Sequence, residues 1–286
     1  MMPDLSPLKP FMTTKDFLVT GETFNLVMDA NSEMLITEPW PSIENLPKYY
    51  ESTDYISHND STKGLISFFY QVIKKRSLRR KLALIAKLNH GVGSILDIGA
   101  GTGDFLLAAS KLGWTANGVE PNENARNTAK KKNILLQKEM DSLTGEKFDV
   151  ITLWHVLEHL PDLENTIKKI ELLLNPGGLL VVAVPNYKSY DAKYYKGFWA
   201  GYDVPRHLWH FSRTAMASLF SKEIQLFKIK PLVFDSFYVS LLSEKYKSNN
   251  RFSLYAIWIG LWSNLIALKT KEYSSLIYIF TKKNKQ

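Results

Sequence analysis

The sequence contains no cysteine among its 286 residues, which excludes a disulfide framework and every metal site built on thiolates. Long apolar runs are also missing. The longest, at 254–268, is shorter than the roughly 20 residues of a spanning helix and contains Ser263 and Asn264. Prolines interrupt the N-terminal stretch MMPDLSPLKPFM, which has no small-residue cleavage site. We therefore expect a cytoplasmic protein without a secretory signal or transmembrane segment, and a buried or interfacial helix over 254–268.

The sequence has fewer acidic than basic residues: 28 aspartates and glutamates against 36 lysines and arginines, for a formal net charge of +8. This excess permits an acidic partner such as phosphate, anionic lipid or nucleic acid, although solubility alone is a sufficient reason for it. The basic run KKRSLRRK at 74–81 precedes a segment with helical apolar spacing, which favours a solvated helix face over a nucleic-acid patch. We expect no nucleic-acid partner.

The order of apolar segments predicts the organisation of the chain. Residues 1–62 alternate short apolar runs with turn residues, which indicates a small N-terminal arm. A helical segment follows, and from about residue 94 short buried strands alternate with helices. This alternation is typical of the doubly wound α/β class, with a mostly parallel sheet and right-handed crossovers. The predicted domains are the arm at 1–62 and an α/β domain at 63–286.

A glycine-rich loop in ILDIGAGTGDFL at 95–106 joins the first predicted strand to a helix. Gly99, Gly101 and Gly103 let the backbone turn tightly and approach a ligand at the carboxyl end of that strand. Their spacing is G-x-G-x-G and departs from the G-x-G-x-x-G of dinucleotide sites, which disfavours a nicotinamide dehydrogenase.

Acidic residues on both sides of this loop indicate what kind of ligand it holds. Asp97 and Asp104 would repel a pyrophosphate, whereas they suit a ligand with a cationic ammonium and sulfonium, such as S-adenosylmethionine. Glu120 closes the second predicted strand, where its carboxylate can accept hydrogen bonds from both ribose hydroxyls.

Taken in order, these motifs resemble the class I S-adenosylmethionine-dependent methyltransferases. Residues 97–103, DIGAGTG, are similar to the first motif of that family, KFDVITLWHVLEHLPD to the segment after its fourth strand, and LLNPGGLLVVAVPN to the turn into its fifth. The resemblance covers about residues 80–230. It implies a Rossmann-like sheet of seven mostly parallel strands, in which EYSSLIYIFTK forms an antiparallel strand between the fifth and sixth. It also implies a cofactor site made of Asp97, Gly99, Ala100, Gly101, Gly103, Glu120, Asp141, Trp154 and His155.

The string TLWHVLEHLPDL at 152–163 also contains H-x-x-E-H, the inverted zinc-protease signature. Zinc ligation through His155 and His159 requires both side chains on one face of one helix. Pro161 opposes such a helix, because in a helix interior it would clash with the carbonyl of Leu157, whereas it is tolerated at a first helical position. We therefore predict a connection from the fourth strand to a new helix that begins near Pro161, over the cofactor cleft and with no metal.

Residues YDVPRHLWHFS at 202–212, together with HVLEHL, resemble the branch that contains ubiquinone-type O-methyltransferases and sugar methyltransferases encoded among polysaccharide genes. Methyl transfer to a hydroxyl requires orientation, exclusion of water and a general base. We expect Pro205 to hold Asp203 and Arg206 apart, so that Arg206 binds an anionic acceptor. The alternative is that these two side chains pair and fix the loop. The candidate catalytic residues are His155, His159, Asp203, Arg206 and His207.

The arm is similar, over FNLVMDANSEMLITEPWPS, to the zinc-ribbon segment that precedes some sugar methyltransferases. Asp29 and Ser32 stand where the cysteines would be, and Glu33 stands where the glycine would be. This resemblance implies a degenerate, metal-free relic. The tyrosine-rich stretch at 49–60 is either a surface loop or a lid over the cofactor.

The predicted function is S-adenosylmethionine-dependent methyl transfer to a small-molecule or glycan-precursor acceptor at oxygen. The alternatives are a sugar C-methyltransferase and a non-catalytic S-adenosylmethionine-binding protein.

Overall fold

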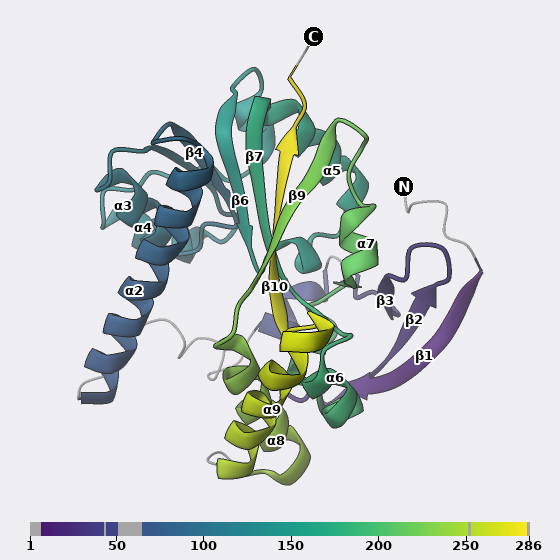
Figure 1. Cartoon of the computed structure of the whole chain (residues 1–286). Coiled ribbons are helices and arrows are strands. Elements are labelled where there is room, and N and C mark those ends of the chain that lie inside the picture. The colour runs from purple at the N-terminus through teal and green to yellow at the C-terminus, as the bar shows by residue number, and fades with distance from the viewer. Residues whose placement is uncertain (1–6, 43, 51–64, 251–252, 285–286) are drawn as a thin grey trace.

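The computed structural model describes residues 7–42, 44–50, 65–250 and 253–284 and contains two sheets (Figure 1). The larger sheet has the spatial order β5–β4–β6–β7–β10–β9. Its strands are parallel except β10, which is antiparallel to both of its neighbours. The predicted doubly wound α/β fold and the position of the last strand are therefore confirmed. The strands are β4 (Ser94–Ile98), β5 (Thr115–Val119), β6 (Phe148–Trp154), β7 (Leu174–Pro185), β9 (Ile224–Pro231) and β10 (Ser275–Lys282).

Of the seven strands expected from the family resemblance, the third in chain order is reduced to one parallel bridge between Val119 and Gln137, at the outer edge of β5. Two hydrogen bonds hold it: Glu120 N donates to Gln137 O and Gln137 N donates to Gly118 O, both at 2.9 Å. A turn at Asn133 precedes this segment, and a short helix, η3 (Met140–Leu143), follows it. Only this one residue pair of the segment between the turn and η3 is bridged to β5.

Apolar residues of the central strands alternate between two cores, one on each face of the sheet. Along β7, Leu180 and Val182 face one core, whereas Leu179 and Val181 face the other, as the two-residue period of an extended strand requires. The first core is covered by α5 (Leu163–Leu173) and α7 (Arg213–Ala217), and the second by α2 (Leu65–Leu88), α3 (Asp104–Ser110) and α4 (Glu123–Lys130). Figure 1 shows α2, α3 and α4 together on one side of the sheet.

The N-terminal arm forms the smaller sheet, which takes its last strand from the α/β part of the chain. Its order is β1 (Leu8–Lys15), β2 (Thr23–Asp29), β3 (Leu35–Glu38) and β8 (Trp209–His210). Val27 packs in the core under α5, and Leu26 packs in a third core with Tyr187 and Trp199. Both faces of this sheet thus contact the larger part of the chain. The domain boundary expected at 62 and 63, like most of the stretch at 49–60, lies outside the described residues.

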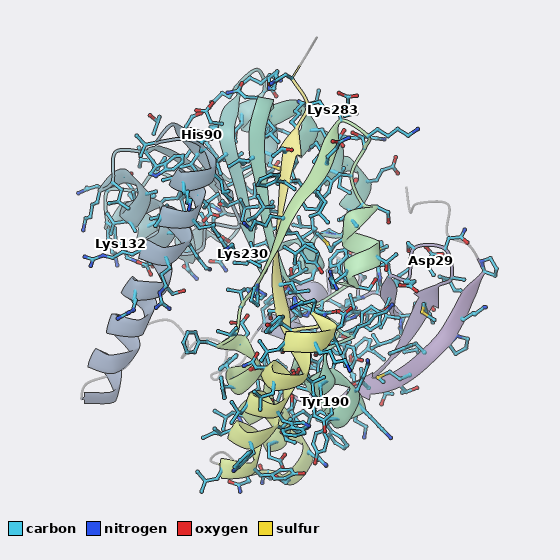
Figure 2. The ribbon with its side chains drawn as sticks, in the orientation of Figure 1. Asp29, His90, Lys132, Tyr190, Lys230 and Lys283 are labelled. Carbon is cyan, nitrogen blue, oxygen red and sulfur yellow. The ribbon has the colours of Figure 1, made fainter. Side chains whose placement is uncertain are left out.

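Hydrogen bonds hold the β2–β3 turn at the positions where the zinc-ribbon resemblance places cysteines. The Asp29 carboxylate accepts from the backbone N–H groups of Asn31 and Ser32, both at 3.2 Å, and from the Ser32 hydroxyl at 2.5 Å. Glu33, at the glycine position, has a φ of 56°, in the left-handed region that glycine favours. Figure 2 labels Asp29 at this turn. The turn is thus held by bonds among its own residues, and its origin as a relic stays a prediction.

Two helices, α8 (Asp235–Ser248) and α9 (Leu254–Thr270), are inserted between β9 and β10 and pack against each other. The helix expected over 254–268 is α9, and its buried face consists largely of small residues, including Ala256, Gly260 and Ser263. Trp258 and Trp262 lie on its exposed face. Within the described residues, no helix combines the length and the apolar character needed to cross a membrane.

The connection from β7 to β8 contains three short helices that pack near the arm. They are α6 (Tyr190–Tyr195), η5 (Lys196–Phe198) and η6 (Ala200–Tyr202). A fourth short helix, η1 (Leu46–Tyr50), follows β3.

Candidate functional site

The glycine loop after β4 is tied to the acid at the end of β5. Gly99 has a φ of 73°, and a Cβ atom on it would lie 2.4 Å from Val156 Cγ2, so only glycine fits there. A Cβ on Gly101 would meet no atom of the described residues within 4 Å. The N–H of Gly101 donates to Glu120 Oε2 at 2.8 Å, and Glu120 Oε1 accepts from Asn122 N at 2.9 Å. The loop therefore presents open backbone beside a buried carboxylate.

The two aspartates that flank this loop differ in their surroundings. Asp97 is buried, and burial raises the pKa of its carboxyl to about 7, although a hydrogen bond from Thr152 Oγ1 at 2.6 Å opposes the shift. Asp104 instead pairs with Lys132 Nζ at 2.6 Å (Figure 2 labels Lys132). Asp104 is thus held in a salt bridge, and its contribution to a ligand's charge stays a prediction.

Trp154 ends β6 and forms one wall of the same region. Its indole Nε1 is buried without a hydrogen-bond partner in the part of the chain that the structure describes. Lys81 Nζ lies 3.7 Å from the centre of its ring, and burial lowers the pKa of Lys81 to about 8. The run at 74–81 is thus not solvated throughout: its described arginines are exposed, whereas Lys81 is partly buried. Lys81 shares a helix face with Leu78 and Ile85, and this spacing was the signal that could have identified it.

His155 follows Trp154 and lies between two carboxylates. Its Nε2 is 3.3 Å from Asp235 Oδ2, and its Nδ1 is 3.5 Å from Glu158 Oε1. Burial lowers the pKa of His155, but the hydrogen bonds and charges of both partners outweigh it and raise the pKa to about 9. An imidazolium at neutral pH cannot accept a proton, so the geometry does not fit the catalytic base expected at His155. Asp235, at the start of α8, is a residue that the sequence reasoning missed.

The segment after His155 confirms that H-x-x-E-H does not form one helix. Residues Leu157–His159 make a single short turn, η4, and α5 begins at Leu163 with the Asp162 side chain as its N-cap. Pro161 separates the two, as predicted. Because His155 contacts Asp235 on another element, it does not share a ligand position with His159.

His159 and His207 come together from different connections of the sheet. Their rings meet edge to face with centres 4.5 Å apart. His159 Nδ1 lies 2.9 Å from the Arg206 carbonyl, and His207 Nδ1 lies 2.9 Å from the Gly201 carbonyl. Burial, together with the charge of His207, lowers the pKa of His159 to about 4, so His159 is neutral at neutral pH.

Arg206 is buried in an ion-pair network and is not available to an acceptor. Its Nε and Nη2 donate to Asp203 Oδ1 at 3.0 and 2.7 Å, its Nη2 also donates to Asp16 Oδ1 at 2.9 Å, and its Nη1 donates to the Tyr49 carbonyl at 2.9 Å. The expectation that Pro205 holds Asp203 and Arg206 apart is wrong. Asp203 and Arg206 pair, which is the alternative raised from the sequence. Arg206 also joins the β7–β8 connection to the arm.

The remaining residues expected to bind a cofactor fall into two groups. Ala100 and Gly103 belong to the glycine loop, where Gly103 N donates to the Ala100 carbonyl at 3.0 Å. Asp141, on η3, pairs with Lys169 Nζ at 2.5 Å, and its side chain is 66% exposed. The structure thus brings the loop, Glu120, Trp154 and His155 to one edge of the sheet, whereas Asp141 is engaged with α5 and its cofactor role stays a prediction.

Comparison with known proteins identifies the family. A family model described as a methyltransferase domain matches residues 70–225, more than half of the chain. Ubiquinone biosynthesis O-methyltransferases from Coxiella burnetii and Histophilus somni are each 33% identical to this chain, over 107 and 106 residues. These alignments cover 34% and 32% of this chain and 46% and 44% of the relatives, so the chain spans about half the length of the curated relatives it matches.

The fold agrees with this match. A structure described as a sarcosine dimethylglycine methyltransferase from Galdieria sulphuraria superposes with a TM-score of 0.51 at 14% identity, covering 75% of this chain and 87% of that one. At this identity the likeness concerns the fold alone. The family match, the order of the sheet and the glycine loop tied to Glu120 agree, and the chain therefore belongs to the methyltransferase domain family, as a class I S-adenosylmethionine-dependent methyltransferase.

Proposed function

We propose that this protein transfers the methyl group of S-adenosylmethionine to a hydroxyl of a small-molecule or glycan-precursor acceptor. The observation that carries the proposal is the hydrogen bond from Gly101 N to Glu120 Oε2, at a glycine whose Cβ position is open. A nucleoside can approach a glycine backbone closely there, and a carboxylate at the end of the second strand can accept its ribose hydroxyls. When bound, S-adenosylmethionine supplies an electrophilic methyl group on a cationic sulfur.

The other residues of this sheet edge fit the cation and exclude water. Asp97 can stabilise a positive charge by ionising. Trp154 offers an aromatic face that Lys81 already occupies in this structure, and its buried Nε1 lacks an acceptor within the described chain. These features support a bound cationic cofactor with apolar walls around the reacting atoms.

The acceptor side is assigned to the polar cluster of Glu158, His159, His207 and Asp203. Its members follow β6 and β7, at the same edge of the sheet as the glycine loop. A hydroxyl nucleophile must lose its proton during methyl transfer, and polar groups at this position can bind it. The ubiquinone O-methyltransferase relatives favour oxygen as the methylated atom.

Two alternatives share the same cofactor site, namely methylation of a sugar carbon and binding of S-adenosylmethionine without catalysis. An anionic acceptor held by Arg206 is not proposed, because that guanidinium is buried and paired. A cytoplasmic location stays a prediction.

Calorimetry tests the cofactor part of the proposal. We expect S-adenosylmethionine and its demethylated product to bind at micromolar strength, and Glu120→Ala to weaken binding by about 1.5–3 kcal/mol, because a charged hydrogen-bond acceptor is lost. Glu120→Gln keeps one acceptor oxygen for Gly101 and should lose less. Glu164→Ala, at an exposed ion pair on α5, is the control. A preference for NAD, or unchanged affinity in Glu120→Ala, would overturn the assignment.

Incubation of the protein with methyl-labelled S-adenosylmethionine and a cell extract tests the reaction. A product labelled on an oxygen supports the proposal, and a product labelled on a sugar carbon supports the first alternative. Intact cofactor binding without a labelled product from any extract supports the non-catalytic alternative.

A further inference from the structure

We infer that Glu158, His159 and His207 form a site for a divalent first-row metal ion such as Zn²⁺. Each residue offers one ligand atom, and these atoms all lie within 4.8 Å of one another. Glu158 and His159 come from η4 after β6, and His207 comes from the connection between η6 and β8. Two segments that are distant in the sequence therefore bring three ligands to one point.

Both imidazoles are oriented as metal ligands are. A backbone carbonyl only accepts hydrogen bonds, so the 2.9 Å contacts to the carbonyls of Arg206 and Gly201 place the proton on Nδ1 of His159 and of His207. An imidazole with this tautomer has its lone pair on Nε2. Histidines that bind metals commonly donate their other N–H to a carbonyl or carboxylate in this way, which fixes the tautomer and the ring orientation.

The Glu158 carboxylate supplies a second, independent observation. Its side chain is 1% exposed, and neither oxygen has a hydrogen-bond partner among the residues that the structure describes. The nearest recorded cation, His155 Nδ1, is 3.5 Å away, longer than a charge-assisted hydrogen bond. The ion pair with His155 offsets part of the cost of burying this carboxylate, and its two oxygens remain available as ligand atoms for a metal ion.

The ligand set indicates which metals fit. Tetrahedral zinc with bonds of about 2.1 Å separates its ligand atoms by roughly 3.4 Å, so side chains within 4.8 Å reach it by small rotations. Two imidazoles and one carboxylate suit zinc and its first-row neighbours, whereas magnesium prefers oxygen ligands. Asp203 Oδ2 lies 3.9 Å from His207 Nε2 and can hold a metal-bound water or act as a further ligand.

This ligand set differs from the one that H-x-x-E-H suggests. That motif pairs His155 with His159, but His155 Nε2 is held by Asp235. A metal ion at the new site can bind an acceptor hydroxyl and lower its pKa, and the imidazoles then serve as ligands. This catalytic role rests on the proposed methyl transfer, whereas the metal site itself does not.

Titration of the chelator-treated, dialysed full chain with Zn²⁺ by calorimetry tests the site. We expect one Zn²⁺ per chain, and an affinity that falls at least about 10- to 100-fold in His159→Ala, in His207→Ala and in Glu158→Gln, because loss of a ligand should cost no less than loss of an outer partner. The control is His90→Asn, at an exposed histidine that is not part of the cluster and that Figure 2 labels. Asparagine tolerates the positive φ of 56° at that position. Circular dichroism verifies that each variant is folded.

Substoichiometric Zn²⁺, or equal affinity in the wild type and in folded His159→Ala and His207→Ala, would overturn the site. Co²⁺ gives a second readout, since its visible spectrum reports tetrahedral coordination and should change in both variants. Measurement of S-adenosylmethionine binding and methyl transfer on the same samples separates the two proposals. Zinc uptake without transfer would reject the function alone, and full transfer by a protein that takes up no zinc would reject the metal site alone.

Discussion

Replacement of Arg206 by alanine should destabilise the fold and leave the affinity for S-adenosylmethionine nearly intact in the folded protein. The side chain of Arg206 is 1% exposed, and that of its partner Asp16 is 0% exposed. Removal of one partner from a buried ion pair leaves the other charge uncompensated and costs about 3–5 kcal/mol.

The local structure around Asp16 places the expected loss near the lower end of that range. The Asp16 carboxylate still accepts from the N–H groups of Leu18, Val19 and Thr20, at 3.1, 3.2 and 2.9 Å. Arg206 and, after it, Thr20 lower the pKa of Asp16 against the effect of burial. The bonds from Leu18, Val19 and Thr20 remain in the variant. We therefore expect Arg206→Ala to lose about 3 kcal/mol of unfolding free energy.

Urea unfolding followed by tryptophan fluorescence measures this loss. Lys168→Ala is the matched control, because its ion pair with Glu164 is shorter, at 2.6 Å, but is exposed on α5. Solvent screens that exposed pair, so its loss should cost far less than the loss of Arg206, and burial and not distance decides the difference. A loss below about 1 kcal/mol for Arg206→Ala, together with a raised KM for the acceptor, would refute this reasoning and restore Arg206 to an acceptor site.

Three further predictions follow from single residues. Asp97 has a pKa of about 7 in the folded protein against 3.8 as its ordinary value, so its contribution to stability is fully present below pH 3.8 and is lost as the pH rises to about 7. Asp97→Asn should remove this part of the pH dependence of the free energy of unfolding in urea. An unchanged pH profile in the variant would contradict the prediction. Gly99→Ala should lose more unfolding free energy than the roughly 1–2 kcal/mol that a left-handed conformation costs an alanine, because its Cβ meets Val156. Gly101→Ala should lose only that amount and should weaken S-adenosylmethionine binding in calorimetry. Equal stability of the two variants would count against the packing argument. Asp29→Ala should lose about 1–3 kcal/mol of unfolding free energy, since three hydrogen bonds of the β2–β3 turn disappear. Its affinity for the cofactor should be unchanged. A changed affinity would show that the arm influences the cofactor site.

The sequence by itself was sufficient for features that depend on neighbouring residues. The period-two and helical patterns predicted the alternating strands and helices, because each reflects one face of a local element. The glycine loop and the break at Pro161 were predicted for the same reason, since backbone turns and a missing N–H act within a few residues. Glu120 was placed correctly because its position follows from the end of a strand in a known topology.

The third expected strand shows where a pattern inherited from a family fails. The bridge at Gln137 has the right position and direction, but it joins only one residue pair. Family motifs indicate the order of the strands, whereas the extent of each pairing depends on the backbone conformation of the whole segment.

Only the tertiary structure decided the state of the charged side chains. Asp16 and Arg206 are 190 positions apart in the sequence, and neither the pairing nor its burial leaves a local pattern. The pKa of His155 is raised because Asp235 on α8 lies beside it together with Glu158. His159 meets His207 because two connections of the sheet end at one edge. Composition and spacing determined which chemistry the chain contains. Burial and long-range partners set the pKa values of those groups and occupy some of them with hydrogen bonds, and they therefore determined which groups are available to a ligand.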